Sequence, residues 1–354
     1  MTGCRVRPVR DDEIEAFERY LEAKGADILQ TPAWASVKAA FGWRVHHLWV
    51  EAGGMVRGAV TILEKRIFWR WSVLYAPRGP VMDAVPDGWR ALAAFVRRWP
   101  TSRPLLLRTD PDRLAAGGED MRRSLEAAGF VEAPPFGPFA GIQPRRVYLV
   151  DLDRQPLFEG LPGKTRYNIR LARRKGLTVR LGTREDVPAF HRLVVETARR
   201  DGFTPRNLPY FLRMYDCLNE RRLAELLIAE KYGEWVAANW VVHFGGRSIY
   251  FYGASSTRLQ HTMGAYLVQW EAMRRAHRLG SRLYDLRGAP VSDTPRGFAQ
   301  GLATFKGRFG EAVDLIGEHD LPLSPVLYWG WRALIGLGRL AGPSLIRPRP
   351  ATAR

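Results

Sequence analysis

The spacing of apolar residues changes twice between positions 248 and 309, and this change predicts a strand, a helix and a second strand. Residues 249–252 form an aromatic and β-branched run that stops at Gly253, as expected for a strand and its end. From 264 to 279 the apolar residues recur every three or four positions, which is the helical period. A second short strand is expected at 283–286. A single helical crossover between two strands predicts that they run parallel, with functional groups at their carboxyl ends. The polar residues so placed are Tyr252, Asp285 and Arg287, with Lys306 just downstream.

The same order of elements occurs twice along the chain. In the first half, patterning and capping residues predict helices at 11–24 and 32–40, strands at 45–51, 57–64 and 71–75, a helix at 87–99, a strand at 105–108 and a helix at 119–128. The second half repeats this order, with helices within 185–203 and 207–222 and strands around 223–231, 235–244 and 248–253, followed by the elements described above. Two such copies in succession predict a duplicated domain.

This order of elements matches N-acetyltransferase-like (GNAT-like) domains. The sequence therefore predicts an α/β protein with mixed sheets, built of two tandem GNAT-like domains with a cleft between them. We expect the first domain at residues 1–145, with 317–345 as a candidate completion, and the second at 146–316. The join is placed near the Pro/Gly-rich stretch 134–138, and residues 346–354 are expected to be a disordered tail.

Composition restricts the class of protein and its partners. The chain has 354 residues, 46% of them hydrophobic, which is enough for a core in each of two domains. Its formal net charge of +18 favours a polyanionic partner such as nucleic acid, a phosphorylated substrate or an anionic membrane. Only two cysteines, Cys4 and Cys217, are present, which excludes a disulfide framework. Neither a signal-peptide pattern nor an apolar run of about 18 residues is visible, so we expect a cytoplasmic protein.

Two segments suggest where polyanions or membranes bind. Residues 164–176 hold six basic side chains in thirteen positions, and Arg166, Arg170, Arg173 and Arg174 fall on one helical face that suits a phosphate backbone. A solvated surface helix is the alternative. Residues 326–342 are apolar and aromatic, interrupted by Arg332 and Arg339. This segment fits either an interfacial amphipathic helix or a helix packed on the first domain.

Several common catalytic arrangements are missing from the sequence. It contains neither a phosphate-binding P-loop nor a dinucleotide-binding glycine motif, and its seven histidines have no metal-ligand spacing. GNAT enzymes bind the pyrophosphate of acetyl-CoA with a glycine-rich turn at a helix start. Here Gln260 lies one residue too far away and the bulky Tyr266 occupies a position that needs a small residue. We therefore expect neither a metal nor a cofactor.

Six motifs, in order along nearly the whole chain, resemble the FemABX family of peptidoglycan interpeptide-bridge aminoacyltransferases. They are LQTPAWASVK (29–38), YAPRGPV (75–81), KTRYNIRLARRKGLTV (164–179), YFYGASS (250–256), YLVQWEAMRRAHRLGSRLYDLRG (266–288) and TFKGRFG (304–310). The resemblance implies a double GNAT-like fold that uses aminoacyl-tRNA in place of acetyl-CoA, in the compact form without a coiled-coil arm. The implied acceptor is the stem peptide of a peptidoglycan precursor, either lipid II or UDP-MurNAc-pentapeptide. A monomer with a peripheral contact to the inner membrane surface fits this reading.

The resemblance also carries candidate roles to single residues. Lys38 matches a lysine that contacts the phosphates of the precursor, and Arg206 and Tyr210 match a pair that lines the same site. Tyr252 matches an aromatic residue of the cleft. We also count Arg78 and Asp285 as candidate substrate-binding residues, although Arg78 equally suits a turn and Asp285 equally suits the anchoring of Arg287. For Arg166, Arg170, Arg173 and Arg174 we expect contact with tRNA.

Two residues are candidates for the reaction itself. Lys306 matches a lysine that stabilises the reacting centre, where a fixed ammonium suits the negative charge that develops on the ester carbonyl. Asp110 matches an acidic residue proposed as the base that takes a proton from the attacking amine. Each has a structural alternative: Lys306 as a surface lysine, and Asp110 as a turn former before Pro111. Tyr210 and Tyr252 have the alternative of ordinary core aromatics.

Two rival functions remain open from the sequence. An N-acyltransferase of the same fold that uses acyl-CoA is disfavoured by Tyr266 and the displaced Gln260. A catalytically inactive duplicate that binds RNA or membrane through residues 164–176 and the C-terminal segment is the third hypothesis.

Overall fold

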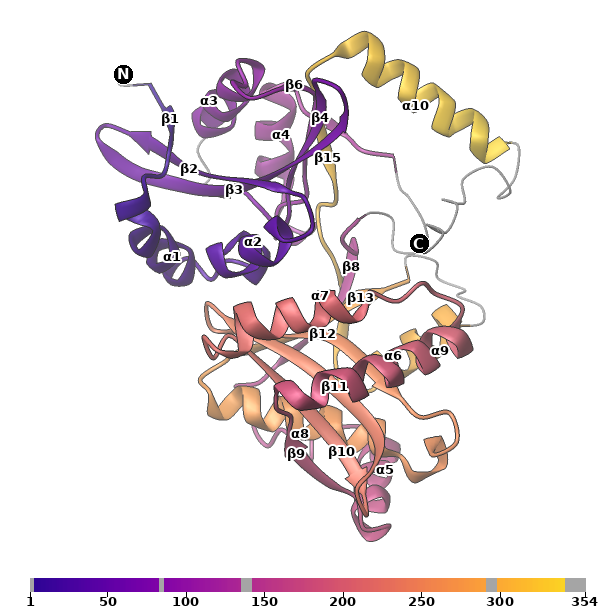
Figure 1. The fold of residues 1–354 in the computed structure, drawn as a ribbon. Coiled ribbons are helices and arrows are strands. Elements are labelled where there is room, and N and C mark those ends of the chain that lie inside the picture. Colours follow the sequence, from indigo (N-terminus) through magenta and orange to yellow (C-terminus); the bar gives the residue numbers. More distant parts are fainter. Residues whose placement is uncertain (1–2, 83–85, 135–141, 291–297, 341–354) are drawn as a thin grey trace.

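Strands from the two halves of the chain form two separate mixed sheets in the computed structural model, which describes residues 3–82, 86–134, 142–290 and 298–340 (Figure 1). The first sheet has the order β1-β2-β3-β4-β6-β15-β7, with β5 paired to β3, and the second has the order β14-β8-β13-β12-β11-β10-β9. We call the first sheet with its helices the first domain and the second sheet with its helices the second domain.

The first domain contains helices α1 (Ile14–Ala23), α2 (Pro32–Ala39), α3 (Pro86–Arg97) and α4 (Glu119–Ala127). Its strands are β1 (Arg5–Pro8), β2 (Arg44–Ala52), β3 (Met55–Phe68), β4 (Trp71–Ala76), β5 (Val81–Met82), β6 (Arg103–Thr109), β7 (Val131–Glu132) and β15 (His319–Pro322). The last strand comes from the far end of the sequence and pairs with β6 and β7. Helix α10 (Pro325–Leu340) follows it.

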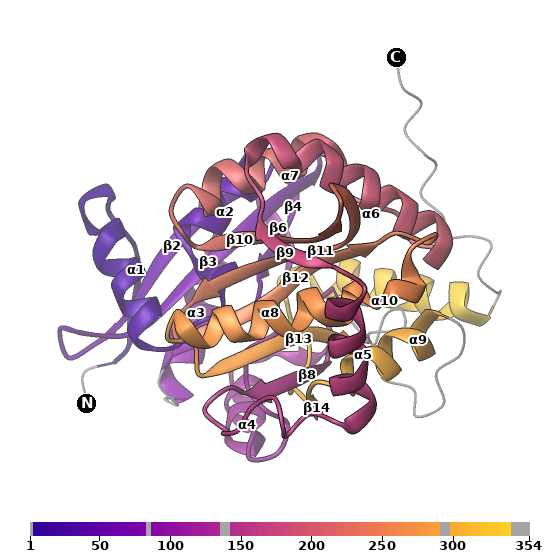
Figure 2. The ribbon, with the colours of Figure 1, turned by 90° about the horizontal axis from the view of Figure 1, so that it is seen from below.

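The second domain contains helices α5 (Gly163–Arg174), α6 (Val187–Asp201), α7 (Leu208–Met214), α8 (Gly264–Arg278) and α9 (Phe298–Lys306). Its strands are β8 (Arg146–Asp151), β9 (Thr178–Leu181), β10 (Ala224–Lys231), β11 (Glu234–Phe244), β12 (Arg247–Ser255), β13 (Leu283–Ala289) and β14 (Glu311–Asp314). Seen from below, α8 and α5 lie on one side of this sheet and α6 and α7 on the other (Figure 2).

The predicted repeat of helical crossovers is confirmed in both domains. Strands β4 and β6 are parallel and are joined through α3, and strands β12 and β13 are parallel and are joined through α8. The alternation along β11 explains why both faces of the second sheet are covered. Ala238, Trp240 and Val242 belong to the core beneath α6 and α7, whereas Ala237 and Val241 belong to the core beneath α8.

Two local predictions were wrong. Gly253 does not end its strand, because β12 continues to Ser255. A side chain at Gly253 would collide with the hydroxyl of Tyr250, so this glycine makes room for the tyrosine ring within the strand. The helix predicted over 207–222 ends at Met214 and is continued by a π-helical turn, Tyr215–Asn219.

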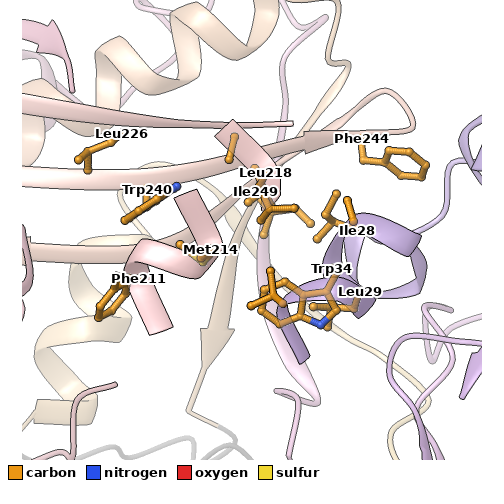
Figure 3. Close-up of a cluster of buried hydrophobic side chains, with 14 of the residues drawn as sticks. Ile28, Leu29, Trp34, Phe211, Met214, Leu218, Leu226, Trp240, Phe244 and Ile249 are labelled. Atoms are coloured by element: carbon orange, nitrogen blue, oxygen red, sulfur yellow. The ribbon is translucent and has the colours of Figure 1, made fainter. Parts of the chain in front are cut away.

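The two domains share one hydrophobic core. Ile28, Leu29 and Trp34, from the start of α2 and the turn before it, pack with Phe211 and Trp240 and other buried residues of the second domain (Figure 3). An interface of this kind resembles the interior of a single domain, and it fixes the orientation of the surfaces that meet beside it.

Helix α10 contacts the first domain through Tyr328. Tyr328 is buried and its hydroxyl donates a hydrogen bond to Asp320, 3.0 Å away. Within the described part of the chain, no helix is both long and apolar enough to cross a membrane. The predicted join at 134–138 falls largely on residues 135–141, and the predicted tail 346–354 lies beyond residue 340, so both lie outside the described residues.

Candidate active site

An irregularity in β12 lies at the centre of the candidate site. The pairing of β11 with β12 shifts between Trp240 and Val241, which leaves Phe251 as the extra residue of a β-bulge. A bulge bends its strand and redirects its side chains. As a result, Phe251 and Tyr252 both contribute to two cavities, one on each side of them.

The first cavity, which we call the Lys306 pocket, has a volume of about 490 Å³. It lies within the second domain, between β12 and the residues 301–306 of α9. Its polar lining includes Asn239, Ser255, Gln260, Arg287 and Lys306, together with Thr197, Arg200 and Asp201 of α6. The second cavity, the Lys38 pocket, has a volume of about 430 Å³ and lies between the domains. Its lining includes Trp34, Lys38 and Trp43 of the first domain and Arg206 and Tyr210 of the second. Phe251, Tyr252 and Arg287 line both cavities.

Lys306 is placed at the inner end of its pocket by the last turn of α9. The side chain is only 5% exposed, and its Nζ donates a hydrogen bond to the carbonyl oxygen of Gly288, 2.8 Å away. The same nitrogen lies 5.8 Å from the ring centre of Tyr250. Burial lowers the pKa of Lys306 to about 7; the nearby Asp285 opposes this shift and Arg287 adds to it. The lysine is therefore buried at a cavity wall, which argues against the alternative of a surface lysine.

Arg287 joins the two pockets and the two domains. Its backbone has a φ of 56°, in the left-handed region, and its N–H donates to Asp285 Oδ1 at 2.6 Å. Its Nη2 donates to Asp27 of the first domain at 3.0 Å. The other terminal nitrogen, Nη1, is buried and has no hydrogen-bond partner among the described residues. A buried guanidinium with an unused donor at the junction of two cavities is available for a substrate oxygen.

The Lys38 pocket has a cluster of positive charge on an aromatic lining. The Nζ of Lys38 lies 5.9 Å from the ring centre of Trp34 and 5.4 Å from that of Trp43. Arg206 lies over the ring of Tyr210, which in turn accepts a hydrogen bond from the hydroxyl of Tyr252 at 3.3 Å. Burial, together with the charges of Arg206 and Lys65, lowers the pKa of Lys38 to about 8. An anion in this pocket would relieve that repulsion.

The predicted site residues Asp110 and Arg78 lie behind the Lys38 pocket, and neither is among the described residues that line either pocket. The carboxylate of Asp110 accepts hydrogen bonds from the hydroxyl of Tyr75 at 3.0 Å and from the N–H of Arg78 at 2.6 Å. Burial raises the pKa of Asp110 to about 7, against the opposing charge of Arg78. The guanidinium of Arg78 donates to the carbonyl oxygen of Pro144 at 2.8 Å. Asp110 thus holds Tyr75, a lining residue, and the turn at Arg78.

Asp285 is fully buried beneath the junction of the pockets. Its carboxylate binds the backbone N–H of Arg287 and forms an ion pair with Arg247 at 2.5 Å. Arg247 in turn forms an ion pair with Asp112 of the first domain. This pair is a second link between the domains, beside that of Arg287 with Asp27. This arrangement places Asp285 as the support of Arg287, which is the structural alternative the sequence left open.

The four arginines predicted to bind tRNA lie along α5, and three of them, Arg170, Arg173 and Arg174, are exposed. Arg166 is partly buried, and its guanidinium donates to the carbonyl oxygens of Glu159 and Leu161, both at 2.6 Å. Both ends of α5 approach elements of the Lys306 pocket. At the start of α5, Thr165 donates to the carbonyl oxygen of Arg308, two residues after Lys306. At its end, Lys175 donates to the carbonyl oxygen of His261, next to Gln260. The two ends of α5 therefore lie close to segments that contribute to that pocket.

At the helix start where GNAT enzymes bind a pyrophosphate, the side chain of Tyr266 packs on Phe305 and Phe309, with ring centres 5.3 and 5.9 Å away. The position is thus filled by an aromatic cluster. Sequence reasoning did not select Phe251, Trp43 or Arg247. The β-bulge that redirects Phe251 has no sequence signature of its own, and the partners of Arg247 are distant in the sequence.

The candidate site thus consists of two pockets that meet at a shared wall, on a fold of two mixed-sheet domains. The sequence profile of the FemAB family matches residues 10–231 and 219–335. The chain therefore belongs to the FemAB family, whose transferases are aminoacyltransferases, and it is an enzyme of this class.

Relatives and solved structures agree with this assignment. The chain is 24% identical to the lipid II:glycine glycyltransferase of Staphylococcus aureus, across 90% of this chain and 93% of the relative. A crystal structure of FemX superimposes with a TM-score of 0.82 and 23% identity, covering 92% of this chain and 99% of that one. A tandem GNAT protein from the clavulanic acid biosynthesis pathway has a TM-score of 0.55 and 13% identity, covering 91% and 99%. These structural likenesses show the fold.

Proposed function

We propose that this protein transfers an amino acid from aminoacyl-tRNA to an amine on the stem peptide of a peptidoglycan precursor. The observation that carries the proposal is the pair of pockets that meet at Phe251, Tyr252 and Arg287, one lined by the buried Lys306 and the other by the partly buried Lys38. Two substrates held in these pockets have their reacting groups at the shared wall, where positioning alone accelerates the reaction greatly.

The Lys38 pocket receives the precursor in this proposal. Lys38 and Arg206 suit the phosphates that both lipid II and UDP-MurNAc-pentapeptide carry, and arginine binds such groups with two parallel hydrogen bonds. The lowered pKa of Lys38 supports an anionic ligand, because the repulsion from Arg206 and Lys65 persists until a negative charge enters. Tyr210 and Tyr252 form the end of the pocket nearest to the other cavity.

The Lys306 pocket receives the aminoacyl end of the tRNA. Helix α5, whose two ends lie close to segments of this pocket, carries exposed arginines that suit the phosphates of the acceptor stem. An acceptor amine then attacks the ester carbonyl carbon, the bond from that carbon to the ribose oxygen breaks, and the amine proton ends on the ribose oxygen. In this proposal the ammonium of Lys306 and the Nη1 of Arg287, which has no hydrogen-bond partner among the described residues, stabilise the negative charge on the carbonyl oxygen.

Asp110 has an indirect part in this scheme. It does not line the Lys38 pocket and contacts the lining residue Tyr75 through that residue's hydroxyl, so we propose that it positions Tyr75 and that the base of the reaction is another group or a water. We further propose that the protein acts in the cytoplasm as a monomer, without a metal or cofactor.

The proposal is tested with purified protein, charged total tRNA, and lipid-linked and UDP-linked precursors offered separately. Mass spectrometry should detect a precursor that is heavier by one amino-acid residue, and ribonuclease treatment of the tRNA should abolish this product. A product formed only when acetyl-CoA replaces charged tRNA would refute the proposal in favour of an acyl-CoA enzyme.

A further inference from the structure

One end of the first sheet collects large apolar side chains that face solvent. At the tip of the β3–β4 hairpin, Ile67 is 55% exposed and Trp69 is 75% exposed. At the start of α10, Val326 is 85% exposed, and Leu327 and Trp329 are about half exposed. Leaving this many large apolar groups in water is unfavourable, which indicates that something covers them.

The hairpin tip and the helix start lie close together because both attach to the first residues of β6. The backbone N–H of Arg103 donates to the carbonyl oxygen of Arg70 at 2.8 Å. The backbone N–H groups of Leu323 and Ser324 donate to the carbonyl oxygen of Leu105 at 2.9 and 3.2 Å. Since β4 and β15 flank β6, the two groups are separated by roughly 10 Å, the width of two strand spacings. Figure 1 shows α10 leaving the first sheet beside β4, β6 and β15, on the side away from the second domain.

The three segments that meet at this end carry only positive charges. They are residues 65–74, 95–107 and 321–340, and none of them contains an aspartate or glutamate. Their basic residues include four exposed arginines, Arg66, Arg70, Arg98 and Arg103. The acidic residue that precedes the first segment, Glu64, is buried and bonded to His46. The surface therefore combines tryptophans, aliphatic side chains and exposed arginines that form no ion pair within the described part of the chain.

We propose that this end of the first domain docks on the surface of an anionic phospholipid bilayer, with Trp69 and Trp329 at the level of the headgroups. Tryptophan favours that level, and arginine is attracted by anionic headgroups. Helix α10 contains only two charged residues, both arginines, among its 16. This composition suits a helix that lies at the interface.

A nucleic acid fits the same surface less well. Ile67, Val326 and Leu327 have no planar face on which a base can stack, whereas binding of single-stranded nucleic acid relies on such stacking. These aliphatic side chains gain from transfer into the acyl region. The docking surface and Tyr75, in the lining of the Lys38 pocket, lie toward opposite ends of β4, so docking leaves that pocket open. The inference does not depend on the proposed reaction.

Sedimentation of the full-length protein with vesicles tests the inference. We expect it to bind vesicles of phosphatidylcholine that contain about one-third phosphatidylglycerol, to bind pure phosphatidylcholine much less, and to be released by high salt. The double variants Ile67→Ser/Trp69→Ser and Val326→Ser/Trp329→Ser should each lower the partition coefficient roughly ten-fold or more. Because these side chains are largely exposed, the thermal unfolding temperature should change little.

The matched control is Tyr232→Ser. Tyr232 is 94% exposed at the tip of another hairpin, lies beside the cation of Lys231, and belongs to the second domain. The Tyr232→Ser variant should bind vesicles as the unaltered protein does. Absence of vesicle binding would overturn the inference. So would an equal loss of vesicle binding in Tyr232→Ser and in Ile67→Ser/Trp69→Ser, the tip variant. Loss of tRNA binding by the tip variant with vesicle binding intact would assign the surface to nucleic acid instead.

Discussion

The guanidinium of Arg287 binds the carboxylate of Asp27 across the domain interface, with its Nη2 3.0 Å from Oδ1 and 2.9 Å from Oδ2. Asp27 caps the turn that leads into α2, which carries Lys38, and Arg287 lies where the two pockets meet. Burial opposes ionisation of Asp27, but Arg287, Arg247 and Arg78 hold the pKa of its carboxyl below the usual value. One ion pair thus couples the position of the first domain to the junction of the pockets.

The second ion pair across the interface predicts a loss of stability. Replacing Arg247 by Met leaves Asp285 and Asp112 without their charged partner in a buried setting, and should lower the free energy of unfolding by about 3–5 kcal/mol. The matched control is Arg282→Met, which removes an exposed pair with Asp153 and should change it by less than about 1 kcal/mol. Denaturant unfolding measures both, and equal effects would contradict the buried role of Arg247.

The buried position of Lys306 predicts a dependence of activity on pH. Burial holds its pKa at about 7, so the protonated fraction falls as the pH rises above that value. Arginine stays protonated throughout this range. If the positive charge assists the reaction, the ratio of kcat/KM for Lys306→Arg to that of the unaltered enzyme should rise by up to about ten-fold per pH unit above 7. A ratio that stays constant with pH would show that the charge of Lys306 is not required.

The Lys38 pocket predicts proton uptake when a precursor binds. The pKa of Lys38 is about 8 in the free protein, and an anionic ligand should raise it. The complex then holds more protons than the free protein at pH 8 to 9, so affinity should fall as the pH rises through that range. Calorimetry of UDP-MurNAc-pentapeptide binding in two buffers of different ionisation enthalpy measures the uptake. Lys38→Met should abolish it and weaken binding roughly ten- to hundred-fold; uptake that persists in Lys38→Met would contradict the assignment.

The exposed face of α5 predicts a change in the salt dependence of tRNA binding. Neutralising Arg170, Arg173 and Arg174 together by glutamine should weaken binding and reduce the slope of log affinity against log salt by about 2 to 3. A triple variant of Arg90, Arg122 and Arg123, exposed or partly exposed arginines on helices α3 and α4 of the first domain, serves as the control and should leave the slope unchanged. Equal slopes for the two variants would exclude α5 from the tRNA interface.

Much of the fold follows from the sequence because its signals are local. The helical period of 264–279 and the turn at Gly280 predict α8 almost to the residue, and the parallel pairing of β12 with β13 follows from the crossover rule. The end of β12 could not be predicted in this way. Gly253 is a strand breaker by its local preference, but here the ring of Tyr250 requires the absence of a side chain. That requirement exists only in the folded sheet.

The site was predicted only in part, for a similar reason. Lys38, Arg206, Tyr210, Tyr252 and Lys306 all line the two pockets, whereas Asp110, Arg78 and Asp285 lie behind them and hold lining residues or the domain interface. A sequence motif contains residues that line a pocket and residues that support it, and does not distinguish between them. The difference depends on contacts between segments far apart in the sequence, such as Asp27 with Arg287.

Single-turnover transfer by the unaltered enzyme and by Lys306→Met tests the central claim most directly. Charged tRNA and precursor are mixed with excess enzyme, and the rate at which the precursor gains one amino-acid residue is measured, with Lys231→Met as the control for an unrelated lysine. The account predicts transfer by the unaltered enzyme and by Lys231→Met, and a rate lower by about 10²–10³ in Lys306→Met with little change in precursor binding. Transfer at the same rate by Lys306→Met would remove Lys306 from the reaction, and no transfer by the unaltered enzyme would contradict the proposed function.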